Sequence, residues 1–66
     1  MYQKKSLVEA ENEAKELSIK FPNTVYYVID KRNGRAKCFS IDWLAIRYIR
    51  YENYFPVCTY QNGIRH

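Results

Sequence analysis

Residues 24–41, TVYYVIDKRNGRAKCFSI, decide the fold. Two runs rich in β-branched and aromatic residues, 24–30 and 35–41, flank a polar segment that ends in Asn33-Gly34. An Asn-Gly pair between two such runs is a strong hairpin signal, because both central positions of the favoured two-residue turn need a positive φ. The stretch therefore predicts an antiparallel β-hairpin.

A two-residue loop at Asn33-Gly34 also predicts which residues lie opposite each other. The resulting pairs are Asp30–Lys37, Val28–Phe39 and Tyr26–Ile41. A shift of two residues would place Val28 against Lys37, so side-chain chemistry favours the first register.

Neither face of the predicted hairpin is predominantly polar, although a half-exposed antiparallel sheet usually has one apolar and one polar face. The first face would carry Val25, Tyr27, Ile29, Ala36, Cys38 and Ser40. The second would carry Tyr26, Val28, Phe39 and Ile41, with charged residues near the turn. The small residues of the first face suit close packing against a helix. The second face then needs a cover, which a helix, a second copy of the chain or a ligand would provide.

A helix is predicted before the hairpin. Ser6 and Glu9 fit a capping box, in which the serine hydroxyl accepts from the N3 amide and the glutamate reaches back to the cap amide. Pro22 ends the helix. Apolar residues recur at helical spacing and predict one buried stripe, formed by Leu7, Ala10, Ala14, Leu17 and Phe21.

The segment 35–52 contains no Gly, Pro or Asn and is too long for one strand. Asp42 is expected to be the N-cap of a second helix, whose buried face would carry Leu44, Tyr48, Tyr51 and Phe55. The alternative is a bulged strand, because WLAIRYIRY (43–51) is rich in β-formers. Residues 57–60 are predicted to form a final strand. Asn62-Gly63 resembles a second hairpin turn, but the three residues after it are judged too few to return as a strand.

The predicted fold class is α+β, one small domain over residues 1–66 in the order α-β-β-α-β. A helix between the second and third strands makes those two strands run in the same direction. The third strand would then lie beside the first, in a mostly antiparallel sheet of order 2-1-3 with two helices. Direct parallel pairing of the second and third strands is the alternative.

Composition favours a folded, cytoplasmic protein that does not associate with a membrane. Hydrophobic residues make up 47% of the chain and aromatic residues 17%, unlike a disordered segment. The N-terminus shows no signal-peptide pattern, and no apolar run approaches the roughly 20 residues that cross a bilayer. Cys38 and Cys58 are expected to be reduced thiols packed as small apolar groups, since small secreted domains are usually denser in cysteine.

The net charge of +4 lies entirely in residues 24–66, together with six of the seven tyrosines. This asymmetry suggests an anionic partner, such as single-stranded nucleic acid or RNA, although a solvated basic surface would look the same. Bases would stack on sheet aromatics, and basic side chains would neutralise phosphates. The candidate nucleic-acid-binding residues are Arg32, Arg35, Lys37, Arg47, Arg50, Tyr26 and Phe39. In the alternative interpretation, Tyr26 and Phe39 are core residues beneath the helices.

Catalysis, a metal site and a cofactor are not expected. The single histidine, His66, lies at the end of the chain, and Cys38, Cys58 and His66 lack zinc-site spacing. Two isolated glycines exclude a glycine-rich phosphate loop. The sequence thus predicts a non-enzymatic binding module for nucleic acid. The alternative is a protein-interaction module or a homodimer that associates through an apolar sheet face.

Overall fold

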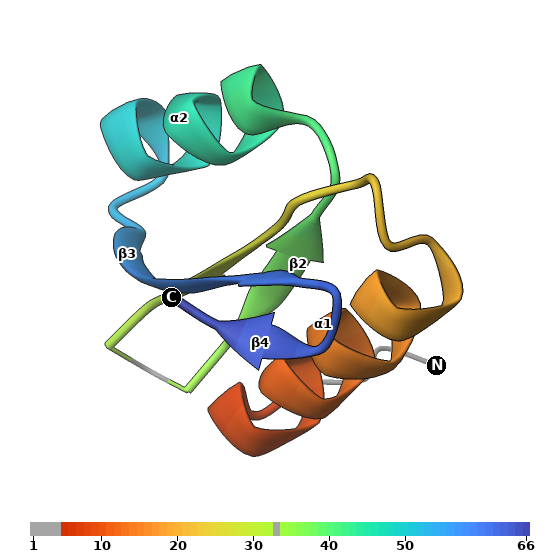
Figure 1. The fold of residues 1–66 in the computed structure, drawn as a ribbon. Helices are drawn as coiled ribbons and strands as arrows, with labels where there is room; N and C mark the ends of the chain where they lie inside the picture. Colours follow the sequence, from red (N-terminus) through yellow and green to blue (C-terminus); the bar gives the residue numbers. More distant parts are fainter. Residues whose placement is uncertain (1–4, 33) are drawn as a thin grey trace.

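The computed structural model describes residues 5–32 and 34–66, and it places an antiparallel sheet between two helices (Figure 1). The strand order is β2-β1-β3-β4, so that β1 and β3 are central. The predicted α+β class, the element order and the 2-1-3 arrangement are confirmed, and the sheet gains a fourth strand. The elements are α1 (Leu7–Lys20), β1 (Tyr26–Asp30), β2 (Lys37–Phe39), α2 (Asp42–Tyr51), β3 (Phe55–Gln61) and β4 (Ile64–Arg65).

The fourth strand corrects the prediction that the chain could not return after Asn62-Gly63. Both turn residues have positive φ, 52° and 77°, as a tight hairpin requires. Backbone pairing extends to Thr59 and His66, whose N–H groups each donate to the other residue's carbonyl oxygen (3.1 and 2.8 Å). The turn is also held from α1, because the Gly63 N–H donates to Ser18 Oγ at 2.9 Å. Tertiary contact therefore stabilises a strand that is too short to form alone.

The register of the first hairpin differs from the predicted one by a single residue. The observed pairs are Tyr27–Phe39, Val28–Cys38 and Ile29–Lys37. The turn is closed by the Gly34 N–H, which donates to the Lys31 carbonyl oxygen at 2.9 Å. Gly34 (φ 76°) thus ends the turn instead of lying at its centre, as in a longer loop with a left-handed residue after the turn. Asn33 itself lies outside the described residues.

Because side chains alternate along a strand, this one-residue shift changes which β2 residues share a face with which β1 residues. Tyr26 and Val28 lie with Ala36 beneath α1, where Cys58 and Tyr60 complete the buried cluster. On the opposite face, Ile29 packs with Ala45 and Tyr54, and Tyr27, Phe39, Tyr48 and Ile49 surround them. The predicted common face for Tyr26 and Phe39 is therefore wrong, and each sheet face is covered by one helix (Figure 1).

The start of α1 confirms the predicted cap. Ser6 Oγ accepts from the Glu9 N–H at 3.2 Å and also donates to Glu9 Oε1 at 3.1 Å, whereas the prediction paired that carboxylate with the cap amide. Ala10 and Ala14 are completely buried, and Leu7 and Leu17 pack beside them. Phe21 follows the last helical residue and is exposed, so it does not belong to the stripe. In the part of the chain that the structure describes, neither helix is long and apolar enough to cross a membrane.

The second helix is confirmed over the strand alternative, but its start and its buried face differ from the prediction. Ile41 is the N-cap residue and Asp42 is the first helical residue, where a carboxylate still interacts favourably with the helix dipole. Ala45, Tyr48 and Ile49 face the sheet. Tyr51 is 70% exposed, because its position lies one side-chain row away from that stripe.

The two cysteines are free thiols, as predicted. Val28 pairs with Cys38 on one side and with Cys58 on the other, so the two cysteines are two strand spacings apart. That separation, about 9–10 Å, exceeds the Cα distance that a disulfide spans. Burial raises the pKa of Cys38 to about 11, so this thiol is protonated at neutral pH.

A single carboxylate oxygen joins α1 to both C-terminal strands. Glu11 Oε1 accepts from Tyr60 OH at 2.9 Å, from Cys58 Sγ at 3.4 Å and from Arg65 Nε at 2.8 Å. The hydrogen bond from Arg65 is the main cause that lowers the pKa of Glu11 below 4.5, with smaller contributions from Tyr60 and Cys58, while burial opposes the shift. The ionised carboxylate therefore stabilises the fold.

Replacing the cap hydroxyl tests the start of α1. We expect Ser6→Ala to reduce the free energy of unfolding by about 1 kcal/mol, because the Glu9 N–H loses its acceptor. Urea denaturation followed by circular dichroism measures the change. Ser40→Ala, an exposed serine outside the helices and strands, is the matched control. Equal stability of the two variants would contradict the assignment of Ser6 as the cap.

The Glu11 contacts predict a pH-dependent stability. A folded pKa below 4.5 means that the stabilisation is complete above pH 4.5 and is lost as the pH falls through the lowered value. We expect Glu11→Gln to lower the urea midpoint at pH 7, and the difference from the parent protein to narrow in acid. Glu16→Gln, an exposed position on the same helix, should leave the midpoint nearly unchanged. A Glu11→Gln effect that is the same at pH 7 and pH 3 would show that its charge is not responsible.

Candidate functional site

Three side-chain rows of α2 have different environments. The row formed by Ala45, Tyr48 and Ile49 packs on the sheet. Leu44, Arg47 and Tyr51 recur at intervals of three and four, so they share the side of the helix next to Tyr48. Trp43, Ile46 and Arg50 form the outer row and are exposed. Only one row packs on the sheet, and most side chains of the other two rows are exposed.

An aromatic cluster holds α2 against the sheet. The Phe39 and Tyr48 rings are stacked, with centroids 5.1 Å apart and planes inclined by 22°. Tyr54 meets Tyr48 edge-on at 5.4 Å. Lys37 Nζ lies 5.4 Å from the centroid of the Tyr48 ring, and Lys31 Nζ lies 5.5 Å from that of Tyr54. These cation–π contacts hold two ammonium groups at the helix–sheet boundary.

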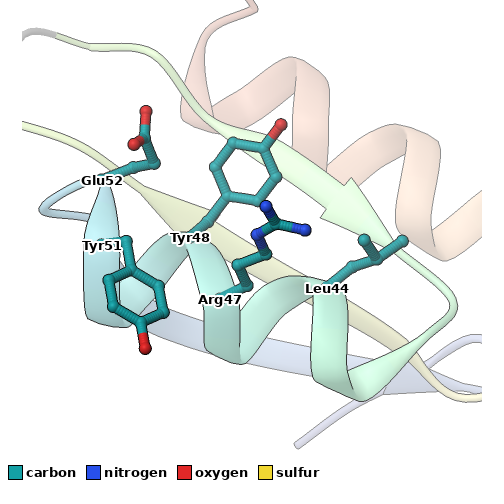
Figure 2. Close-up of a pocket in the computed structure, with 5 residues that line it drawn as sticks. All are labelled: Leu44, Arg47, Tyr48, Tyr51 and Glu52. Carbon is teal, nitrogen blue, oxygen red and sulfur yellow. The ribbon is translucent and has the colours of Figure 1, made fainter.

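The candidate site is an open groove beside this cluster, which we call the tyrosine groove. Its volume is about 500 Å³, and its lining residues are Leu44, Arg47, Tyr48, Tyr51 and Glu52 (Figure 2). In Figure 2 the Arg47 and Tyr48 side chains extend to the same side of α2, and Glu52 stands at the end of the helix. Because Lys37 rests on Tyr48, two cations border a surface that contains two phenol rings.

A second open groove, of about 600 Å³, lies at the C-terminal end of α2. It contains Lys31 and Arg32 from the β1–β2 loop and the half-exposed ring of Phe55 from β3. The remaining lining residues are Ile49, Asn53 and Tyr54. Asn53 has a φ of 61°, and this left-handed residue turns the chain from α2 into β3. Basic and aromatic side chains thus also meet at the end of the helix.

The structure brings some of the predicted binding residues together and separates others. Phe39, Lys37 and Arg47 gather around Tyr48. Arg32 lies in the second groove, and Arg50 is exposed on the outer row of α2. Arg35 is half-buried in the loop before β2. Tyr26 is 8% exposed beneath α1, on the opposite face of the sheet, so its ring is not accessible to a base.

Two tyrosines were not included in the predicted set. Tyr48 is the centre of the aromatic cluster, and Tyr51 is the most exposed ring of the tyrosine groove. The four-residue spacing of Ala45 and Ile49 could have revealed the exposure of Tyr51, because a buried stripe through these two residues leaves Tyr51 outside it. The buried face predicted from the sequence instead ran from Leu44 to Phe55 and included Tyr51, so that residue was expected to be buried.

The tyrosine groove presents a guanidinium group and two phenol rings. Arginine and lysine bind phosphate oxygens, and an exposed phenol ring stacks on planar bases. The described residues contain no cluster of three His, Cys, Asp or Glu side chains that would hold a metal ion.

Comparisons of this chain with protein-family models, with curated proteins and with solved structures give no match.

Proposed function

We propose that this protein is a non-enzymatic binding module that recognises single-stranded nucleic acid through the tyrosine groove. The observation that supports this proposal is the exposed Tyr51 ring, 70% accessible, in the same groove as Arg47. A ring at such a site offers a face to an unpaired base while the guanidinium binds a neighbouring phosphate. Lys37, held on Tyr48, adds a second positive charge beside the groove.

The geometry favours a single strand over a duplex, because stacking on Tyr51 requires a base that is not already stacked in a helix. α2 has only 10 residues, and its two exposed rows carry two arginines between large apolar side chains. Glu52 lines the same groove and would repel a phosphate there. The strand would therefore run with its phosphates toward Arg47 and away from Glu52.

The second groove would extend this surface around the end of α2. Arg32 would bind a further phosphate, and Phe55 would supply a second stacking face. Together with Arg47, Arg50 and Lys37, this arrangement allows three or four phosphate contacts, without the half-buried Arg35. The proposed site keeps Arg32, Lys37, Arg47 and Arg50, adds Tyr51 and omits the buried Tyr26. We place this activity in the cytoplasm, where two free thiols stay reduced.

The salt dependence of binding tests this proposal. Each neutralised phosphate releases counterions, so log affinity for a single-stranded oligonucleotide should fall with log salt by about 0.7 per contact. Arg47→Gln should reduce the magnitude of the slope by about 0.7. Tyr51→Ala should weaken binding by about 1–3 kcal/mol and leave the slope unchanged, because it removes stacking without removing charge. Fluorescence anisotropy with labelled RNA or DNA measures both quantities.

The matched controls are Lys15→Gln and Phe21→Ala, which remove an exposed charge and an exposed ring from α1 and from the residue that follows it. Both should bind like the parent protein. If the protein bound neither single-stranded RNA nor single-stranded DNA at about 50 mM salt, where electrostatic binding is strong, nucleic-acid binding would be rejected. A protein-interaction module would then be the better assignment.

A further inference from the structure

The outer row of α2 leaves two large apolar side chains uncovered. Trp43 is 57% exposed and Ile46 is 50% exposed, although both belong to residue types that contribute most when buried. Ile46 and Arg50 lie four residues apart, as do Asp42 and Ile46, so these three share one side of the helix. That side is angularly separate from the Arg47–Tyr51 row of the tyrosine groove. A contact there would leave the tyrosine groove open.

An apolar hollow of about 210 Å³ adjoins this row, between α2 and β3. Ile46 and Ile49 line it from the helix, and Pro56 and Val57 line it from the strand. The β1–β3 register shifts at this point, because Val28 pairs with Cys58 while Ile29 pairs with Pro56, which leaves Val57 as an extra residue. Such a bulge reorients side chains. Val57 packs against the cluster beneath α1, whereas Pro56 pairs with Ile29 and lines the hollow beside the exposed Ile46.

The outer row carries an acidic residue at one end and a basic residue at the other, so its charges are complementary to those of an antiparallel copy of the same row. Asp42 lies at the N-terminal end of α2 and Arg50 at the C-terminal end, about 12 Å apart along the axis, with Ile46 midway. Among the described residues, neither Asp42 nor Arg50 takes part in an ion pair. If two such helices lie antiparallel, each aspartate faces the arginine of the other helix. The same alignment places each Trp43 opposite Ile49 of the other helix, at the edge of its hollow.

We propose that this face binds a second copy of the chain, with the two α2 helices antiparallel about a two-fold axis through Ile46. The interface is isologous: Asp42 pairs with Arg50 of the second copy twice, and Trp43 packs twice against the hollow. Trp43 and Ile46 supply the apolar contact, and the ion pairs align the register more than they strengthen binding.

The dimer is expected to be weak and dependent on concentration. α2 is about 15 Å long, so the contact is smaller than the 1,200–2,000 Å² of a stable interface. The proposed dimer does not depend on the nucleic-acid proposal. Because the tyrosine groove lies on another side of the helix, both copies keep Arg47 and Tyr51 accessible, and Arg50 is the one residue that the two proposals share.

A charge exchange between the two ends of α2 tests the antiparallel pairing. Asp42→Arg places arginine against arginine, and Arg50→Asp places aspartate against aspartate. We expect each single variant to self-associate roughly tenfold more weakly than the parent protein in sedimentation equilibrium. An equimolar mixture of the two single variants should associate again, because both ion pairs between the two copies then join opposite charges. The double variant Asp42→Arg/Arg50→Asp should regain self-association.

Trp43 is the only tryptophan, so its emission gives a second measurement on the unmodified chain. Burial in the dimer should shift the emission to shorter wavelength as the concentration rises, and Lys15→Glu on α1 should have no effect. Circular dichroism confirms that each variant is folded. A protein that remains monomeric up to about 1 mM would overturn the proposal. A dimer that both single variants form as well as the parent protein would also overturn it, because another surface would then mediate the contact.

Discussion

The rest of the structure depends on β1, a five-residue strand with apolar side chains on both faces. Tyr26 and Val28 point to one side, while Tyr27 and Ile29 point to the other, so neither face is stable in water. Each face needs a helix, and the chain provides one before the strand and one after the hairpin. Pairing with β2 and β3 satisfies the backbone of β1 on both edges. The layered arrangement of helix, sheet and helix follows from this one strand.

The two helices are held by different physical means. α1 buries alanines and Ser18 closely against the sheet, and it is tied to β3 and β4 through Glu11 and Ser18. α2 rests on stacked rings, with lysines packed over two of them. Open grooves lie beside α2, and Tyr48 and Tyr54 of this aromatic cluster line them. The surfaces proposed to bind partners therefore lie around α2.

The structure shows where the excess basic residues of the second half of the chain lie. Most of these basic residues lie in three places. Lys37 and Arg47 border the tyrosine groove, and Lys31 and Arg32 line the groove at the end of α2. Arg65 is used inside the fold, where it pairs with Glu11. A net charge alone thus overstates the positive surface that a nucleic acid would meet.

The sequence by itself determined the elements whose signals are local. The Ser6 cap, the stop at Pro22 and the hairpin follow from neighbouring residues. The second helix and the order of the first three strands were favoured by the sequence, but a bulged strand and a parallel pairing remained open until the tertiary structure decided between them. The hairpin register, β4 and the exposure of Tyr51 were decided by tertiary structure. A one-residue change in the loop moves Tyr26 and Phe39 to opposite faces, and the local preference of Asn33-Gly34 favoured the shorter loop that the protein does not use. β4 depends on Ser18 and Glu11, which lie more than 40 residues away in sequence. The side of α2 that faces the sheet was selected by which residues fit against Ile29 and Phe39, and this long-range packing left Tyr51 and Trp43 exposed.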